Sequence, residues 1–91
     1  DNQCHIAHKV IIGDNTIIAG QSAISGSTIV GKNCVIGGQV GISDHLEIVD
    51  DVIILSKSGV TKDLKKACKY VGFPAQPSRE FWRKKLNKNK N

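Results

Sequence analysis

The fold of this chain is decided by residues 6–60, which read IAHKVIIGDNTIIAGQSAISGSTIVGKNCVIGGQVGISDHLEIVDDVIILSKSGV. An isoleucine or valine fills every sixth position of this stretch without a gap: Ile6, Ile12, Ile18, Ile24, Val30, Ile36, Ile42, Ile48, Ile54 and Val60. Ten filled positions at one spacing are a repeat of six residues, which is typical of parallel β-helices. The sequence therefore predicts an all-β fold of this kind.

A unit of six residues provides one short strand and one turn, and three units close one triangular coil. Each aliphatic side chain then points inward and stacks on the residue eighteen positions away. The apolar spacing of three and four that an amphipathic helix needs is absent from residues 6–60. A glycine-rich β-sandwich is the alternative, but it would show strict alternation broken by longer turns. The small residues that follow many of the aliphatics, such as Gly13 and Gly31, are expected to fit tight corners. The period does not decide the hand of the coil.

The chain of 91 residues is long enough for one domain and divides into three segments. Residues 1–65 are predicted to be β-helix, residues 66–77 (KACKYVGFPAQP) an irregular connection, and residues 78–91 a basic helix with a frayed tail at 87–91. Ser78 follows a proline and is a suitable N-cap for that helix. Because the repeat is already in phase at Cys4, further coils are expected before residue 1, and the fragment alone is expected to be inactive.

Charge is distributed unevenly along the chain. Residues 1–61 carry three lysines against six carboxylates, a net charge of −3, whereas residues 62–91 carry ten Lys or Arg against two carboxylates, a net charge of +8. A basic tail can bind nucleic acid, membranes or acidic proteins, and it can also be a solvated helix. Nucleic acid is not expected as a partner, because the tail lacks the aromatic stacking residues that single strands need.

The three cysteines, Cys4, Cys34 and Cys68, form no CxxC motif, and their number is odd. Free thiols of this kind suit a reducing compartment. No signal peptide and no apolar run of membrane-spanning length is visible, so we expect a cytoplasmic protein without an integral membrane segment.

The period of eighteen residues also predicts a candidate site. His8 lies two residues after Ile6, at a corner of the coil, and Gly26 and then Asp44 follow at the same corner in the next two coils, with His45 beside Asp44. An exposed histidine near an unpaired backbone N–H suggests acid–base chemistry beside an oxyanion donor. The competing interpretation is that these are ordinary corner residues.

A metal site is a weaker alternative. His5 and His8 form an HxxH pair, and His45 could be contributed by another chain. Two imidazoles without a third ligand at a matching level do not complete a zinc site, so no metal is expected.

Three stretches of the sequence carry a family resemblance. They are DNQCHIAHKVIIGDNTIIAG, GKNCVIGGQVGISDHLEI and GFPAQPSREFWRK, and together they resemble the C-terminal half of the UDP-3-O-(3-hydroxyacyl)glucosamine N-acyltransferases. The resemblance covers essentially the whole chain. The IAH motif and the PAQPSREFWR ending are its more specific parts, because hexapeptides alone are shared by many acyltransferases.

The resemblance implies a left-handed parallel β-helix and a homotrimer with active sites between subunits. It also implies an enzyme of lipid A biosynthesis in Gram-negative bacteria. Such an enzyme moves a 3-hydroxyacyl chain from acyl carrier protein to the 2-amine of UDP-3-O-acylglucosamine. It uses no cofactor of its own, because phosphopantetheine is carried by the acyl-carrier substrate. The family's N-terminal uridine-binding domain and early coils are not in this chain, so nucleotide recognition cannot be inferred.

Site residues follow from the resemblance by position. The histidine of IAH implies that His8 is the general base, and the histidine before Leu-Glu-Ile implies that His45 supports catalysis or donor binding. The backbone N–H of Gly26 corresponds to the oxyanion donor. Asp1 and Asn2 correspond to a pair that is a candidate for holding the glucosamine, whereas the resemblance gives Asp44 no role.

Acyl carrier proteins are acidic, and the basic tail is therefore expected to bind the carrier. The residues expected to do so are Lys62, Arg79, Arg83, Lys84 and Lys85. Two other functions stay open. One is the sister activity of a UDP-N-acetylglucosamine O-acyltransferase, which shares the HIAH start but normally continues differently and has a longer helical C-terminal domain. The other is a non-catalytic β-helix scaffold.

Overall fold

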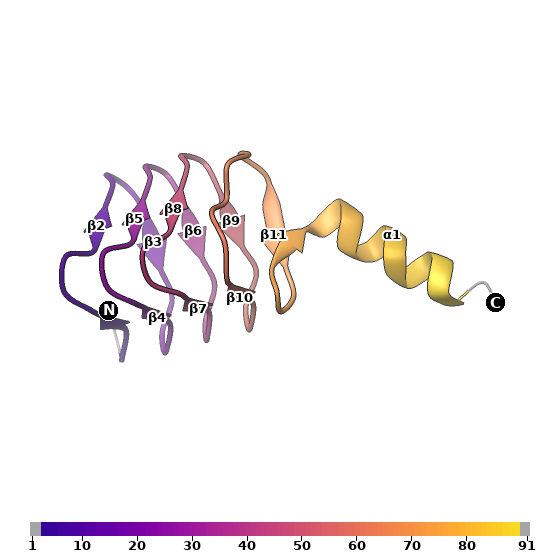
Figure 1. Cartoon of the computed structure of the whole chain (residues 1–91), viewed down its shortest axis with the longest axis horizontal. Helices are drawn as coiled ribbons and strands as arrows, with labels where there is room; N and C mark the ends of the chain where they lie inside the picture. Colours follow the sequence, from indigo (N-terminus) through magenta and orange to yellow (C-terminus); the bar gives the residue numbers. More distant parts are fainter. Residues whose placement is uncertain (1–2, 90–91) are drawn as a thin grey trace.

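The computed structural model describes residues 3–89, in which short strands stack into a parallel β-helix and one helix projects from its end (Figure 1). Ten strands of two residues recur every six residues. They are β1 (His5–Ile6), β2 (Ile11–Ile12), β3 (Ile17–Ile18), β4 (Ala23–Ile24), β5 (Ile29–Val30), β6 (Val35–Ile36), β7 (Gly41–Ile42), β8 (Glu47–Ile48), β9 (Ile53–Ile54) and β10 (Gly59–Val60). Strand β11 (Lys69–Val71), strand β12 (Gln76–Pro77) and helix α1 (Ser78–Asn89) follow.

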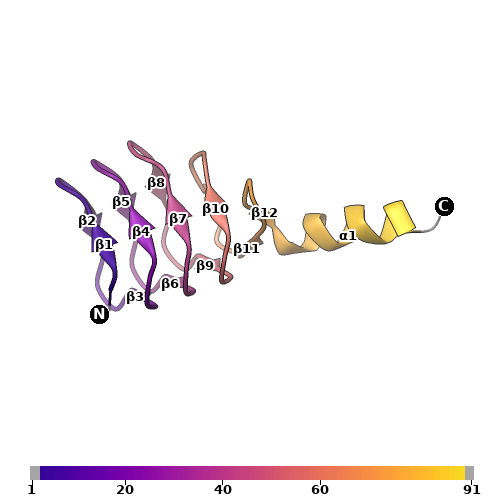
Figure 2. The same cartoon turned by 90° about the horizontal axis from the view of Figure 1, so that it is seen from below.

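The strands form three sheets, which are the three sides of the coil (Figure 2). Sheet A has the order β1-β4-β7-β10, sheet B has the order β2-β5-β8, and sheet C has the order β12-β11-β9-β6-β3. Ile6 pairs with Ile24 and Ile24 with Ile42, so each strand pairs in parallel with the strand eighteen residues later. The predicted parallel β-helix is confirmed.

The core consists of the predicted inward register. From the fourth unit onward these aliphatics are at most 2% exposed: Ile24, Val30, Ile36, Ile42, Ile48, Ile54 and Val60. Polar members of the second register are buried too and are hydrogen-bonded, as when Thr28 Oγ1 donates to the Ser43 carbonyl at 2.8 Å. The expectation for Ile6 is wrong, because this side chain is 45% exposed. Within the described residues, a coil stacks on only one side of it.

Each turn contains one residue in the left-handed backbone region, at a position that the sequence pattern did not indicate. Ten residues in the left-handed region recur every six residues, and none is a glycine: Gln3, Lys9, Asn15, Gln21, Ser27, Asn33, Gln39, His45, Asp51 and Lys57. Gly13 and Gly31 were expected to be needed for tight corners, but they do not occupy the left-handed position of the turns. They are needed because of close packing between coils. A Cβ on Gly13 would lie 2.6 Å from the Gly31 carbonyl carbon, so the next coil's backbone passes too close for a side chain.

The C-terminal segment is more regular than expected. Residues 66–77 were predicted to be an irregular connection, but β11 continues sheet C beside β9 and then pairs with β12 in antiparallel fashion. Tyr70, in β11, is only 5% exposed and closes this end of the core. Helix α1 begins at Ser78 as predicted and continues to Asn89, into the segment expected to be frayed, whose last two residues lie outside the described part. Within residues 3–89, no helix is long and apolar enough to cross a membrane.

Candidate active site at the corner between sheets A and B

Three successive turns connect sheet A to sheet B, and they carry the predicted site residues. His8 follows β1, Gly26 follows β4, and Asp44 and His45 follow β7. The Ser27 N–H donates to the His8 carbonyl at 3.1 Å, and the His45 N–H donates to the Gly26 carbonyl at 3.0 Å. These bonds join one turn to the next, so the spacing of eighteen residues does stack the three turns in one column.

His8 is the imidazole at the start of this column, and its side chain is exposed. It lines a shallow cavity of about 350 Å³ together with His5, Ile6 and Ala7. His5 lies on the outer face of sheet A, whereas His8 lies on the turn. The structure thus brings both histidines of the HxxH motif to one cavity. Among residues 3–89, no group of three or more His, Cys, Asp or Glu side chains could hold a metal ion.

Gly26 lies in the middle turn of the column. Within residues 3–89, its backbone N–H has no hydrogen-bond acceptor, and the N–H of Asp44 at the same place in the next turn has none either. The free N–H is therefore a general property of this turn. What distinguishes Gly26 is the missing side chain, because a Cβ there would lie 3.3 Å from the His8 carbonyl oxygen. Gly26 thus combines an N–H that has no acceptor among residues 3–89 with the lack of a side chain, in the turn stacked on that of His8, and both features suit an oxyanion donor.

His45 is one residue out of line with His8. It occupies the left-handed position of its turn, with φ 56°, and so corresponds to Ser27 in the turn before. Its side chain is exposed. Two coils separate it from His8, which at ordinary strand spacing is about 10 Å. His45 can contact a substrate that extends along the column, but it lies too far along to share one proton directly with His8.

A groove that the sequence analysis missed runs along the outer face of sheet A. Its volume is about 320 Å³, its outward strand positions are Ala23, Gly41 and Gly59, and Phe73 lies at its far end. A Cβ on Gly59 would lie 2.5 Å from the Phe73 ring, whereas one on Gly41 would meet nothing within 4 Å. The sequence does contain a sign of this groove, because the outward residues of sheet A at a spacing of eighteen, Ala23, Gly41 and Gly59, are all small.

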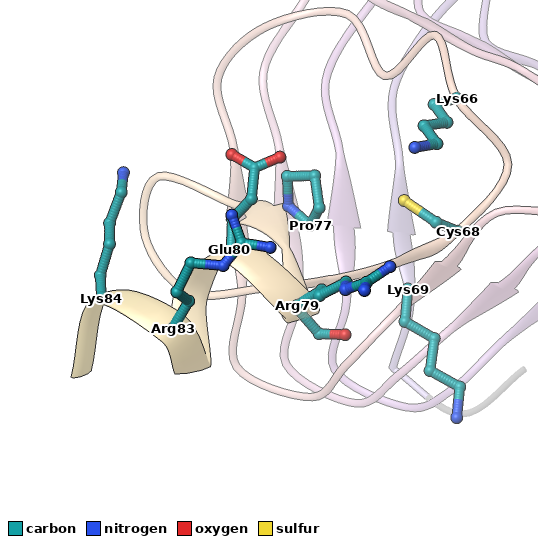
Figure 3. Close-up of a pocket in the computed structure, with 9 residues that line it drawn as sticks. Lys66, Cys68, Lys69, Pro77, Arg79, Glu80, Arg83 and Lys84 are labelled. Atoms are coloured by element: carbon teal, nitrogen blue, oxygen red, sulfur yellow. The ribbon is translucent and has the colours of Figure 1, made fainter. Parts of the chain in front are cut away.

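The residues predicted to bind a carrier do not form one patch. Lys62 lies between β10 and Leu64, in a turn two residues shorter than those of the His8 column, and is exposed. Arg79, Arg83 and Lys84 lie on α1 and line a separate cavity at its base (Figure 3). The Lys85 ammonium group lies over the Phe81 ring, 5.4 Å from its centroid.

The two residues predicted to hold the glucosamine, Asp1 and Asn2, lie outside the described residues. Their position relative to His8 therefore stays a prediction from the sequence.

Comparison with curated proteins gives a consistent set of relatives, although no family model matches the chain. It is 53% identical over 83 residues to the UDP-3-O-acylglucosamine N-acyltransferase of Maricaulis maris, 91% of this chain and 24% of the relative. The enzymes of the same name from Shewanella denitrificans and Campylobacter lari are 50% and 46% identical, over 92% and 89% of this chain. This chain spans about a quarter of the length of each of these relatives.

Solved structures support the fold. The acetyltransferase domain of PglB from Neisseria gonorrhoeae has a TM-score of 0.58 at 14% identity, over 82% of this chain and 54% of that domain. A maltose O-acetyltransferase from Clostridium difficile has a TM-score of 0.54 at 19% identity, over 81% of this chain and 64% of that enzyme. At these identities the likeness is one of fold.

Proposed function

We propose that this chain is the part of a UDP-3-O-acylglucosamine N-acyltransferase that carries the general base and the oxyanion donor. One observation carries the proposal. The two stacked turns that carry His8 and Gly26 lie inside a stretch that is about half identical to enzymes of that name. The reaction would transfer a 3-hydroxyacyl chain from acyl carrier protein to the 2-amine of the sugar nucleotide, a step of lipid A biosynthesis.

The geometry supports a direct acyl transfer. As the amine nitrogen bonds to the thioester carbonyl carbon, His8 takes the proton that the nitrogen must lose. The carbonyl oxygen becomes an oxyanion, which the Gly26 N–H is placed to stabilise. The carbon–sulfur bond then breaks, and the thiol leaves with the proton that His8 returns. His45, further along the column, would contact the donor.

The groove on sheet A suits the acyl chain. It begins one coil from His8, at Ala23 and Ser25, and extends over Gly41. Outward positions without large side chains leave room for an alkyl chain along the sheet, and apolar contacts along it would position the thioester.

Several further features of the proposal come from the resemblance. Asp1 and Asn2 would hold the glucosamine. The phosphopantetheine arm arrives on the carrier, so the enzyme would need no cofactor of its own. The three thiols are free, which suits the reducing cytoplasm as the place of the reaction.

The product of the reaction tests the proposed function. We expect the full-length enzyme, given a 3-hydroxyacyl carrier and the 3-O-acylated UDP-glucosamine, to form an amide, seen by mass spectrometry and resistant to mild alkali. Acylation of a hydroxyl of UDP-N-acetylglucosamine instead would establish the sister O-acyltransferase activity. Absence of turnover with either acceptor would favour the scaffold.

We further propose a cyclic homotrimer that completes the site. The outer faces of sheets B and C expose aliphatic side chains, with Ile11 60% and Ile29 44% exposed on one and Ile17 62% and Val35 40% on the other. A closed ring of three needs two different complementary surfaces on each subunit. Packing sheet B of one copy on sheet C of the next would cover both faces and bring the neighbour close to the His8 corner.

The trimer can be tested by light scattering. We expect Ile29→Glu to convert the full-length protein to a monomer, because a carboxylate would be buried against an apolar face. Ala23→Glu, at the equivalent outward position of sheet A, should leave the trimer intact. A wild-type monomer that retains activity would contradict this proposal.

Two of the residues predicted to bind the carrier, Lys62 and Lys85, do not line the α1 cavity. We propose that they attract the acidic carrier. Reversing both of them, in Lys62→Glu/Lys85→Glu, should raise the apparent KM for the acyl carrier several-fold at low salt. The loss should shrink as ionic strength rises. Lys62→Gln/Lys85→Gln, which removes charge without reversing it, should have a smaller effect in the same steady-state assay. If the KM of the wild type and of both double variants responded equally to salt, the tail would have no role in carrier binding and would be only a solvated helix.

A further inference from the structure

A second cavity lies at the base of α1, where the helix leaves the coil (Figure 3). Its volume is about 550 Å³, larger than that of the groove on sheet A. The charged side chains that line it are Lys66, Lys69, Arg79, Arg83, Lys84 and Glu80. Five cationic residues and one carboxylate thus line the cavity, which carries a net positive charge.

The walls of this cavity are held in place by the fold. The buried Tyr70 donates its hydroxyl hydrogen to the Lys66 carbonyl at 2.8 Å, which ties the loop before β11 to the coil. Burial raises the pKa of the Tyr70 hydroxyl, and a hydrogen bond to Cys68 raises it further, so it stays a donor in the neutral range. On the helix side, Lys84 donates to the Gln76 side chain at 3.2 Å.

The cations that line the cavity come from two parts of the chain distant from the His8 corner, the segment at β11 and helix α1. In Figure 3 the Arg79 guanidinium points from the first turn of α1 toward Lys69 at the start of β11, and Cys68 lies just before that strand. Like charges held around one hollow repel one another, and an anion between them removes that cost. Arginine in particular offers paired donors that match phosphate oxygens.

We propose that this cavity binds a small phosphate-bearing anion with at least two negative charges. A hollow of this size is larger than a bare phosphate ion needs and is within the usual range for small-molecule sites. The concave shape of the cavity favours a small ligand. An acidic protein surface would instead contact the cations outside the cavity, such as Lys62 and Lys85. This site goes beyond the acyl-transfer site and does not depend on it.

Isothermal titration of the full chain with inorganic pyrophosphate at low salt tests the site. We expect saturable binding of one pyrophosphate per chain. Arg79→Gln and Lys69→Gln, both at exposed positions, should each weaken it about tenfold, because a hydrogen bond between charged groups is lost. Lys85→Gln removes the same charge from the same helix but lies outside the cavity, and it should change the affinity less than twofold.

Four results would overturn the proposal. Absence of saturable binding would do so, and so would equal weakening by Lys85→Gln, which would show diffuse attraction to the tail. Binding to vesicles that contain phosphatidic acid, without binding of free pyrophosphate, would make the surface a membrane contact. Tighter binding of a hexaglutamate peptide than of pyrophosphate, lost in Arg79→Gln, would make it a protein-docking surface.

Discussion

Replacing His8 with alanine is expected to lower the turnover number of the full-length enzyme by about 10²–10⁴-fold, the usual contribution of a general base. In the proposed acyl transfer the amine must lose a proton as it attacks, and His8 is the exposed imidazole on the turn that stacks on the turn of Gly26. Steady-state assays with saturating acyl carrier and sugar nucleotide measure this effect.

The fold should not be affected by this change, because the His8 side chain is exposed and its main-chain carbonyl keeps its hydrogen bond from Ser27. Circular dichroism and light scattering of the variant serve as the control. Turnover within about threefold of wild type, in a correctly assembled protein, would show that another group accepts the proton.

Replacing Ile36 with aspartate is expected to unfold the coil. Ile36 is fully buried between the aliphatics of the neighbouring coils, and a carboxylate there would be an unpaired charge without water. Losses of this kind exceed about 4 kcal/mol, which is a large part of the stability of a small domain. Thermal unfolding followed by circular dichroism measures the change.

Ala23→Asp is the matched control for this prediction. It introduces the same side chain at the outward position of an equally short strand, where the residue is exposed. We expect this variant to keep a cooperative transition close to that of the wild type. A cooperative transition of unchanged midpoint for Ile36→Asp would contradict the assignment of the inward register.

The repeat predicted the coil well because its physical cause is local and periodic. Each aliphatic at the sixth position meets the one eighteen residues away, so Ile24 and Ile42 could be placed in the core from spacing alone. Ile6 shows the limit of this reasoning. Its position in the register is right, but burial depends on a neighbouring coil on each side, and within the described residues Ile6 has one only on the side of Ile24.

The C-terminal segment could not be predicted from the period because the period changes there. Lys69 pairs with Ile53, sixteen residues earlier, so the chain continues sheet C while the six-residue count fails. The cavity at the base of α1 depends on that extra strand and on the helix that follows it. The sequence therefore indicates only that these five cations belong to a basic C-terminal segment, and not that they line one cavity.

The candidate site was predicted in outline for the same reason as the coil. His8, Gly26 and Asp44 are eighteen residues apart, and the turns that carry them are hydrogen-bonded to one another. The groove over Gly41 and Gly59 was missed because small residues on an outer face have no effect on the core. The special place of His45, in the left-handed position of its turn, is a backbone property that the pattern of side chains does not show.

One steady-state comparison tests most directly whether the His8 corner is the active site of an N-acyltransferase. His5, His8 and His45 are each replaced by alanine in the full-length enzyme and assayed with the same acyl carrier and 3-O-acylated sugar nucleotide. We expect His8→Ala to lose the most turnover, His45→Ala less, and His5→Ala the least, although His5 and His8 line one cavity. An inactive His5→Ala beside an active His8→Ala would contradict the assignment of the base and of the corner column.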